Sequence, residues 1–315
     1  MTDPFYDEPS YLTELPDDLK LKRAAAARRR RWRRRLALGA MIAVAGAVVA
    51  LVATSLGGED SSSQPTTTDA QQTEPQETTP NAAVAAYPAG WEPHPGPVPV
   101  LDYNAIETPT AAEPFPELFV EPQDFEDQMQ WLDEEGFEAV TLDQVEEAWY
   151  EKGRLPAKPV VVSFDDGYPS QYSSGFAALE KRDWPAVLNL VARGSELPDA
   201  EVEKMLDAGW ELASKATTDV DLTTLDSTTL EQEVAGSRRI LRRRFDVPVN
   251  NFCYPLGRYS TTVISAVHRA GYAGAQTQIA GVADASTPYI IDRIPILLSD
   301  GLEGFVSKLQ SAGAV

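Results

Sequence analysis

Short apolar runs alternate with segments of helical periodicity through the last two thirds of the chain, and this alternation constrains the fold more than any other feature. The run KPVVVSF at 158–164 has the length and composition of a buried strand. The segment at 124–135 instead carries Phe125, Met129 and Leu132 at helical spacing, which predicts an amphipathic helix. Strands that alternate with helices predict a parallel α/β architecture. About seven such units fit an open or distorted barrel better than a two-lobed fold.

The remaining elements follow the same pattern. Further strands are predicted at 98–106, 137–142, 185–191, 210–216, 251–257, 272–278 and 289–296, and further helices at 145–149, 173–182, 199–208 and from residue 226 or 227 onward. The last of these helices carries five arginines between residues 238 and 244, which we interpret as a solvated face, with a binding patch as the alternative.

The first 94 residues differ in composition from the rest. Residues 36–56 form a stretch of 21 residues without a charge. At ~1.5 Å per residue it is long enough to cross the ~30 Å hydrocarbon core of a bilayer. Ten basic residues between positions 20 and 35 precede it, which by the positive-inside rule places the N-terminus in the cytoplasm.

These features predict a single-pass protein of the plasma membrane. Its parts are a cytoplasmic basic segment at 1–35, a transmembrane signal anchor at 36–56, a disordered extracytoplasmic stalk at 57–94 and a globular domain at 95–315. A cleaved signal peptide is the alternative for the apolar stretch, although that stretch and the segment before it are long for one.

Charge and residue usage exclude several classes of function. The chain has 48 acidic and 27 basic residues, a formal net charge of −21, which argues against a nucleic-acid partner. A single cysteine excludes a disulfide scaffold and a cysteine-rich zinc site. The chain has only two histidines, His94 and His268, which limits both metal binding and general acid–base chemistry.

Two adjacent carboxylates, Asp165 and Asp166, follow the buried strand at 158–164 and precede Gly167. In a parallel barrel, binding and catalytic residues lie at this carboxyl end of the strands. Two carboxylates so close disfavour joint ionisation unless a cation or strong hydrogen-bond donors are near. The pair is therefore either a general base next to a metal ligand, or a helix cap with a spare acid in a turn.

Several ordered segments resemble the motifs of the polysaccharide deacetylase (NodB-homology) family of carbohydrate esterases. These segments are VPVLDYN at 98–104, VVVSFDDGY at 160–168, GWELASKATTDVDLTTLD at 209–226, FCYPLGRYS at 252–260, AGYAGAQT at 270–277 and Arg-Ile-Pro at 293–295. The resemblance covers roughly residues 97–310 and implies a distorted (β/α) barrel of the NodB-homology type, preceded here by the one predicted transmembrane helix. It also implies metal-dependent removal of N-acetyl groups from glycans, a hydrolysis of non-peptide C–N bonds.

The resemblance assigns roles to individual residues. Asp165 is the candidate base and Asp166 the candidate metal ligand. The backbone N–H of Leu256, between Pro255 and Gly257, is the candidate donor to the oxyanion.

The sequence departs from the family pattern at the metal. The positions of the two metal-binding histidines are occupied by Lys215 and Asp219. A protonated lysine cannot bind a metal, and its ammonium is expected either to pair with Asp165 or Asp166 or to be solvated in a loop. Asp219 is a candidate second oxygen ligand beside Asp166, a pair that suits a hard divalent cation better than zinc.

Other family histidines also lack counterparts. The opening strand has Asn104 where the family often has histidine, and Ser299 stands where a loose alignment places the histidine that acts as general acid.

Two functions follow. The first is a membrane-anchored, deacetylase-like protein that acts at cell-envelope polysaccharide or peptidoglycan and has impaired or no metal-dependent N-deacetylation, a pseudoenzyme. The alternative is an active glycan N-deacetylase with an aspartate-based set of metal ligands. Both have the lipid bilayer as a partner and neither has nucleic acid.

Overall fold

The computed structural model describes residues 87–315. The predicted cytoplasmic segment, the predicted transmembrane anchor and most of the predicted stalk lie outside the described residues. Within the described range, no helix is long and apolar enough to cross a membrane.

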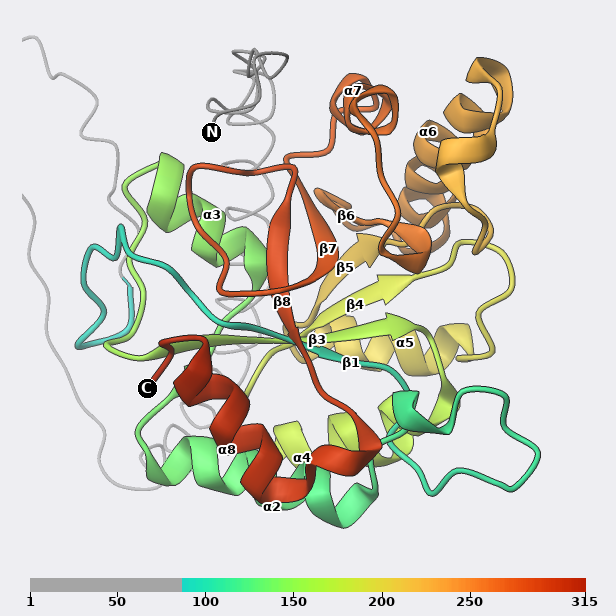
Figure 1. The fold of residues 1–315 in the computed structure, drawn as a ribbon. Coiled ribbons are helices and arrows are strands. Elements are labelled where there is room, and N and C mark those ends of the chain that lie inside the picture. Colours follow the sequence, from blue (N-terminus) through green and yellow to red (C-terminus); the bar gives the residue numbers. More distant parts are fainter. Residues whose placement is uncertain (1–86) are drawn as a thin grey trace, which may run out of the picture. The chain divides into compact units, whose positions relative to one another are not determined.

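Seven parallel strands form a closed barrel (Figure 1). In chain order they are β1 (Val100–Tyr103), β3 (Pro159–Asp166), β4 (Val187–Leu190), β5 (Glu211–Ser214), β6 (Asn251–Cys253), β7 (Gly274–Ala280) and β8 (Ile291–Pro295). The neighbours run in the order β1, β8, β7, β6, β5, β4, β3, and the barrel closes because β1 also pairs with β3. The short strand β2 (Glu138–Ala139) pairs with the first residues of β3. The predicted parallel (β/α) barrel is confirmed, and it is closed rather than open.

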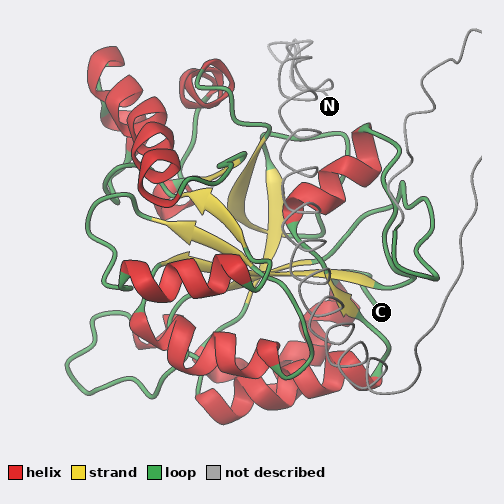
Figure 2. Cartoon of the chain, turned by 180° about the vertical axis from the view of Figure 1, so that it is seen from behind, coloured by secondary structure: helices red, strands yellow, loops and turns green. Residues whose placement is uncertain are grey.

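Helices cover the outside of the barrel (Figure 2). They are α2 (Pro122–Glu134), α3 (Leu142–Tyr150), α4 (Ala177–Glu180), α5 (Asp199–Asp207), α6 (Ser227–Phe245), α7 (Thr261–Arg269) and α8 (Gly301–Ser311), with a π-helical turn at Gln171–Phe176 before α4. Helix α8 has no counterpart among the sequence predictions.

The ends of the helices follow from local side-chain chemistry. The Asp226 carboxylate accepts hydrogen bonds from the backbone N–H groups of Thr228 and Thr229, at 2.9 and 3.0 Å, and so caps α6. Thr141 caps α3 in a reciprocal capping box with Gln144. This cap also explains why the strand predicted at 137–142 is reduced to two residues, since the chain turns into α3 from Thr141.

Large aromatic side chains fill the core. The rings of Phe164 and Trp210 stack with centroids 5.2 Å apart, and the Trp210 ring is buried. Trp184 and Tyr254 are buried as well, so these aromatic residues pack in the core.

The contacts of the folded part begin near the predicted boundary at residue 95. The Trp91 ring is buried, and Glu92 pairs with Leu155 just before β3.

Candidate active site

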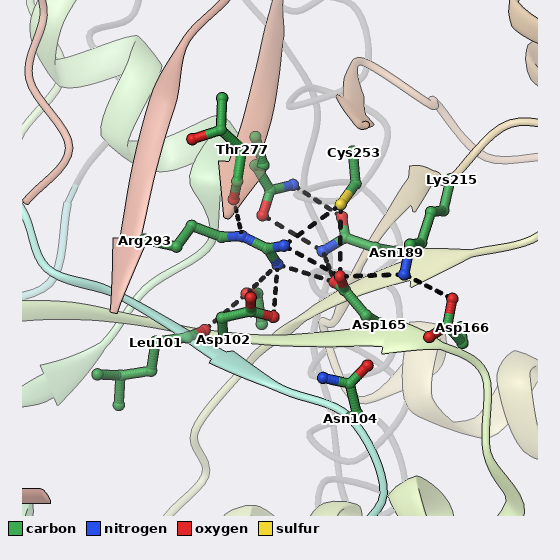
Figure 3. A network of polar contacts seen from close by, with 12 residues as sticks. Leu101, Asp102, Asn104, Asp165, Asp166, Asn189, Lys215, Cys253, Thr277 and Arg293 are labelled. Atoms are coloured by element: carbon green, nitrogen blue, oxygen red, sulfur yellow. Dashed lines mark hydrogen bonds and ion pairs between the residues drawn. The ribbon is translucent and has the colours of Figure 1, made fainter. Parts of the chain in front are cut away.

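Asp165 is the centre of a buried network of polar groups at the carboxyl end of β3 (Figure 3). Its side chain is fully buried. The neighbouring strand β4 places Asn189 directly beside it, and the Asn189 amide donates to Oδ1 of Asp165 at 2.8 Å. The Cys253 thiol, at the end of β6, lies 3.5 Å from Oδ2 of Asp165.

Arg293 holds Asp165 with both terminal nitrogens. Nη1 donates to Oδ1 at 2.8 Å and Nη2 to Oδ2 at 3.0 Å, while Nε donates to the Thr277 carbonyl at 2.7 Å. The same guanidinium lies 2.9 Å from Oδ1 of Asp102, at the end of β1. Arg293 is fully buried, so its charge is compensated by Asp165 and Asp102 rather than by water.

Lys215 places a second cation against the paired carboxylates. It directly follows β5, and its Nζ lies 2.6 Å from Oδ1 of Asp166 and 3.3 Å from Oδ2 of Asp165. Only 4% of its side chain is exposed. The expected pairing of the ammonium with Asp165 or Asp166 is thus present with both residues, and the solvated-lysine alternative is wrong.

Burial and charge act on these groups in opposite directions. Burial opposes the ionisation of Asp165, but the charges of Arg293 and Lys215 outweigh it and hold the pKa of Asp165 well below its usual range. Burial favours a neutral Lys215, but Asp165 and Asp166 outweigh it and raise the pKa of Lys215 well above its usual value. Lys215 is therefore an ammonium throughout the ordinary pH range.

Two other carboxyls differ from Asp165. Burial and the charge of Asp165 outweigh the ammonium of Lys215, which lowers the pKa of Asp166, so the pKa of Asp166 is raised above its usual value. Burial, opposed by Arg293, raises the pKa of Asp102 to about 7. The network therefore holds more than one proton-binding group next to two permanent cations.

The backbone at Asp166 and Gly167 is in the left-handed region. Their φ values are 76° and 87°. A Cβ at Gly167 would lie 2.3 Å from Oγ of Ser195 and 2.5 Å from Cδ1 of Leu190, so only glycine fits there. This turn fixes the direction in which the Asp166 carboxylate leaves the strand.

The residues present do not fit the divalent metal that the resemblance implies. The ammonium of Lys215 contacts both candidate carboxylates, and Arg293 occupies both oxygens of Asp165. Between residues 87 and 315, no group of three or more His, Cys, Asp or Glu side chains is arranged to hold a metal ion.

The other candidate residues lie around the mouth of the barrel. Asp219 is exposed in the loop after β5, and its negative charge contributes to the raised pKa of Asp166, after burial and after Asp165. Leu256 lies in the turn after β6 with a left-handed backbone (φ 56°, ψ 15°) and a side chain 49% exposed. The proposed use of its backbone N–H as an oxyanion donor stays a prediction. Ser299 is exposed and donates from Oγ to Glu117 at 2.8 Å.

Neither histidine joins the network. His94 contacts the Pro97 carbonyl at 3.4 Å, before β1. His268, at the end of α7, packs edge-on against Tyr289 and is half-buried.

Sequence reasoning missed Arg293, Asp102 and Asn189 as members of the site. In the sequence, Arg293 stands out only as part of the late Arg-Ile-Pro segment. A signal was present, because Asp102, Asn189 and Arg293 are polar residues inside otherwise apolar strand patterns, and such residues need partners when buried.

Comparison with known proteins agrees with this fold. Residues 152–275 match the sequence profile of the family described as polysaccharide deacetylase. The folded domain is similar to polysaccharide deacetylases. It is 23% identical over 215 residues to the putative polysaccharide deacetylase YxkH of Bacillus subtilis, covering 67% of this chain and 74% of that protein. It is also 33% identical over 123 residues to the poly-β-1,6-N-acetyl-D-glucosamine N-deacetylase of Escherichia coli, or 39% of this chain and 17% of that protein.

Solved structures of deacetylases share the fold. The Streptococcus pyogenes deacetylase PplD, solved in complex with acetate, is 24% identical with a TM-score of 0.63, covering 68% of this chain and 99% of that one. A polysaccharide deacetylase from Bacillus cereus is 25% identical with a TM-score of 0.61, covering 68% of this chain and 69% of that one.

Proposed function

We propose that this polysaccharide deacetylase-family protein is a membrane-anchored pseudoenzyme that binds cell-envelope polysaccharide or peptidoglycan and does not remove N-acetyl groups by metal-dependent hydrolysis. The observation that carries the proposal is the ion pair of Lys215 with Asp165 and Asp166. A built-in ammonium compensates the carboxylates that would otherwise attract a divalent cation.

Ligand number supports the loss of metal binding. A catalytic metal site for hydrolysis normally has three protein ligands and one open position. In the range 87–315 only Asp166 and Asp219 remain as candidates, and Asp166 is paired with Lys215. Loss of a single residue that merely orients a ligand typically reduces metal affinity or activity by ~10–100-fold, so loss of a direct ligand has a larger effect.

The state of Asp165 supports the loss of general-base chemistry. A general base works best when its pKa lies near the working pH. The pKa of Asp165 is held well below its usual range, and its oxygens are shared among Arg293, Asn189 and Lys215. A carboxylate so strongly stabilised as an anion is a poor proton acceptor.

The glycan partner and the anchor rest on separate arguments. Glycan binding is inferred from the family, one relative of which is named as a poly-N-acetylglucosamine deacetylase. The anchor is inferred from the uncharged stretch at 36–56 and the basic residues before it.

Protease added to intact cells that lack an outer barrier should cut the predicted stalk and release the globular domain as an acidic fragment. If the globular domain is degraded only after the cells are lysed, the proposed orientation is wrong.

Acetate release and metal content test the proposal. The purified chain, made without added metal, should contain no stoichiometric zinc and should release no acetate from N-acetylated glycans, with or without divalent cations. The variant Lys215→His with Asp219→His should gain metal affinity, because Asp166 is already in place. If the natural protein releases acetate and Asp165→Asn abolishes the release, the pseudoenzyme proposal is wrong. The alternative, an active N-deacetylase with Asp166 and Asp219 as metal ligands, would then hold.

A further inference from the structure

Helices α6 and α7 carry a cluster of exposed arginines. We call this cluster the arginine surface, and it consists of Arg239, Arg242, Arg243 and Arg269. Beneath the arginine surface, the buried Arg238 side chain links α6 to the segments that precede β6 and β7. Its Nε donates to the Val249 carbonyl at 2.8 Å, and its Nη1 donates to the Ala270 carbonyl at 3.1 Å. The cluster therefore sits on a rigid support rather than on a loop.

The arginine surface has no acidic partner within the part of the chain that the structure describes, whereas the neighbouring Arg244 is paired with Asp199. This is unexpected because acidic residues outnumber basic ones about two to one in the globular domain. The α6 dipole favours cations in the last turn and accounts for Arg242 and Arg243 in part, but Arg239 lies earlier in the helix. Exposed like charges held close together favour an anionic partner.

The arginine surface lies at the amino ends of the barrel strands. Val249 and Ala270, whose carbonyls bind Arg238, come just before β6 and β7. The chain also enters the domain at this end, where Glu92 pairs with Leu155 just before β3. The candidate site with Asp165 and Lys215 lies at the opposite, carboxyl end.

We propose that the arginine surface docks on the phosphate headgroups of an anionic phospholipid bilayer, the membrane that holds the predicted anchor. Guanidinium groups bind phosphate through paired hydrogen bonds, which suits them to this contact better than lysines. The inference rests on the proposed anchor. Between residue 56 and Trp91 the chain has 34 residues. A disordered stalk of that length, which the sequence predicts, would have a root-mean-square span of about 30–35 Å and would keep the domain within reach of the bilayer.

Charge complementarity selects this end of the domain. The excess of acidic residues repels an anionic bilayer, but charges more than ~8 Å apart are largely screened at physiological salt, so the local cluster governs contact. Docking through the amino ends would point the mouth of the barrel away from the bilayer. The glycan-binding site proposed above would then face the cell envelope.

The test uses the full chain reconstituted in nanodiscs of phosphatidylcholine, with or without phosphatidylglycerol. A fluorophore is attached to Asp207→Cys, exposed at the end of α5 near the amino ends, or to Thr262→Cys, exposed at the start of α7. Headgroup-labelled lipid then quenches whichever fluorophore lies near the bilayer. We expect quenching at position 207 only in discs with phosphatidylglycerol, and little quenching at position 262.

The matched variants separate local from overall charge. Each arginine near an anionic surface contributes about fivefold to partitioning, so Arg239→Glu, Arg242→Glu and Arg243→Glu together should weaken docking at least ~100-fold. The control reverses Lys181, Arg193 and Lys204, three exposed residues outside the arginine surface, and should leave docking unchanged. Docking that survives the arginine reversal, or is equal in discs without phosphatidylglycerol, overturns the proposal.

Two further outcomes are informative. If the arginine surface binds soluble polyphosphate while position 207 remains unquenched on anionic discs, the partner is a soluble polyanion and the bilayer proposal is wrong. If the chain fails to copurify with discs, the anchor proposal is wrong. Cosedimentation with phosphatidylglycerol vesicles then tests the docking proposal separately from the anchor. If the chain does not cosediment, the docking proposal is wrong.

Discussion

Arg293 and Asp165 lie 128 positions apart in the chain and are joined by two hydrogen bonds of 2.8 and 3.0 Å inside the barrel. The closure of the barrel brings them together, because β8 pairs with β1 and β1 pairs with β3. Both side chains are fully buried. The pair is thus a structural element as well as a feature of the candidate site.

We expect Arg293→Met to destabilise the domain by about 3–5 kcal/mol, because it removes the cation that pairs with buried Asp102 and leaves buried Asp165 with Lys215 alone. Urea unfolding of the two proteins measures the difference. Arg154→Met is the matched control, since Arg154 forms an exposed pair with Glu92 and such pairs contribute about 0–1 kcal/mol. A loss at Arg293 as small as that at Arg154 would show that the network is not important for stability.

Lys215→Met tests the second cation. It removes the ammonium from Asp165 and Asp166, and we expect a loss of about 3–5 kcal/mol at neutral pH. Without Lys215, the pKa of Asp166 rises further, because burial and the charge of Asp165 are no longer opposed by the ammonium. The folded variant then binds a proton at Asp166 at a higher pH than the unfolded chain does. Its deficit relative to the natural protein should therefore shrink as the pH falls. Unfolding free energies at pH 5 and pH 8 measure the change, and an equal deficit at both would contradict this account.

The sequence predicts that the Lys215 ammonium pairs with Asp165 or Asp166 as one of two alternatives, but it does not predict the other members of the buried network. Lys215 and Asp166 occupy positions that the family resemblance assigns to the metal site, so their pairing could be foreseen as one of these alternatives. Arg293 could not be assigned in the same way, since its partner depends on how the last strand closes the barrel. The left-handed backbone at Asp166 was equally hidden, because nothing in a single sequence marks a non-glycine residue held in that region. Parallel strands and most helices were recoverable, since periodicity and capping are local properties.

Gly167 and Gly136 form a matched pair for a test of the turn after β3. Both have positive φ, 87° and 78°, but a Cβ at Gly136 would meet no atom within 4 Å, whereas one at Gly167 would meet Ser195 and Leu190. We expect Gly136→Ala to destabilise by about 1 kcal/mol from backbone strain alone. Gly167→Ala should destabilise by more, through an additional steric clash of about 1–3 kcal/mol. Thermal unfolding of both variants decides, and equal losses would contradict the close packing of this turn.

A cluster of carboxyls remote from the candidate site leads us to expect a pH dependence of stability. Glu211 begins β5 fully buried and accepts hydrogen bonds from the backbone N–H of Asp143 at 2.7 Å and from the Asn251 amide at 2.9 Å. Asn251 also donates to Glu146 at 3.2 Å. Burial, followed by the charges of Asp143 and Glu146, raises the pKa of Glu211 to about 8.

The sign of the effect follows from proton binding. In the unfolded chain Glu211 has its ordinary pKa of 4.5, so between pH 4.5 and about 8 the folded protein holds a proton that the unfolded chain lacks. Stability should therefore be greatest at the acid end of this window and fall by up to about 1.4 kcal/mol per pH unit towards pH 8. Asp102 adds to the same trend up to about pH 7.

Glu211→Gln removes the titration and keeps one acceptor oxygen, which serves either Asp143 or Asn251, because these two donors bind different oxygens of Glu211. We expect the variant to be more stable than the natural protein at pH 8 and to show a flatter dependence of unfolding free energy on pH between 5 and 8. Glu231→Gln, an exposed glutamate on α6, is the control and should leave the slope unchanged. Denaturant unfolding across this pH range is the measurement. If the stability of the natural protein instead rises from pH 5 to pH 8, and Glu211→Gln shows the same slope, our account is wrong. Glu211 would then be ionised in the folded protein, with its charge compensated in another way.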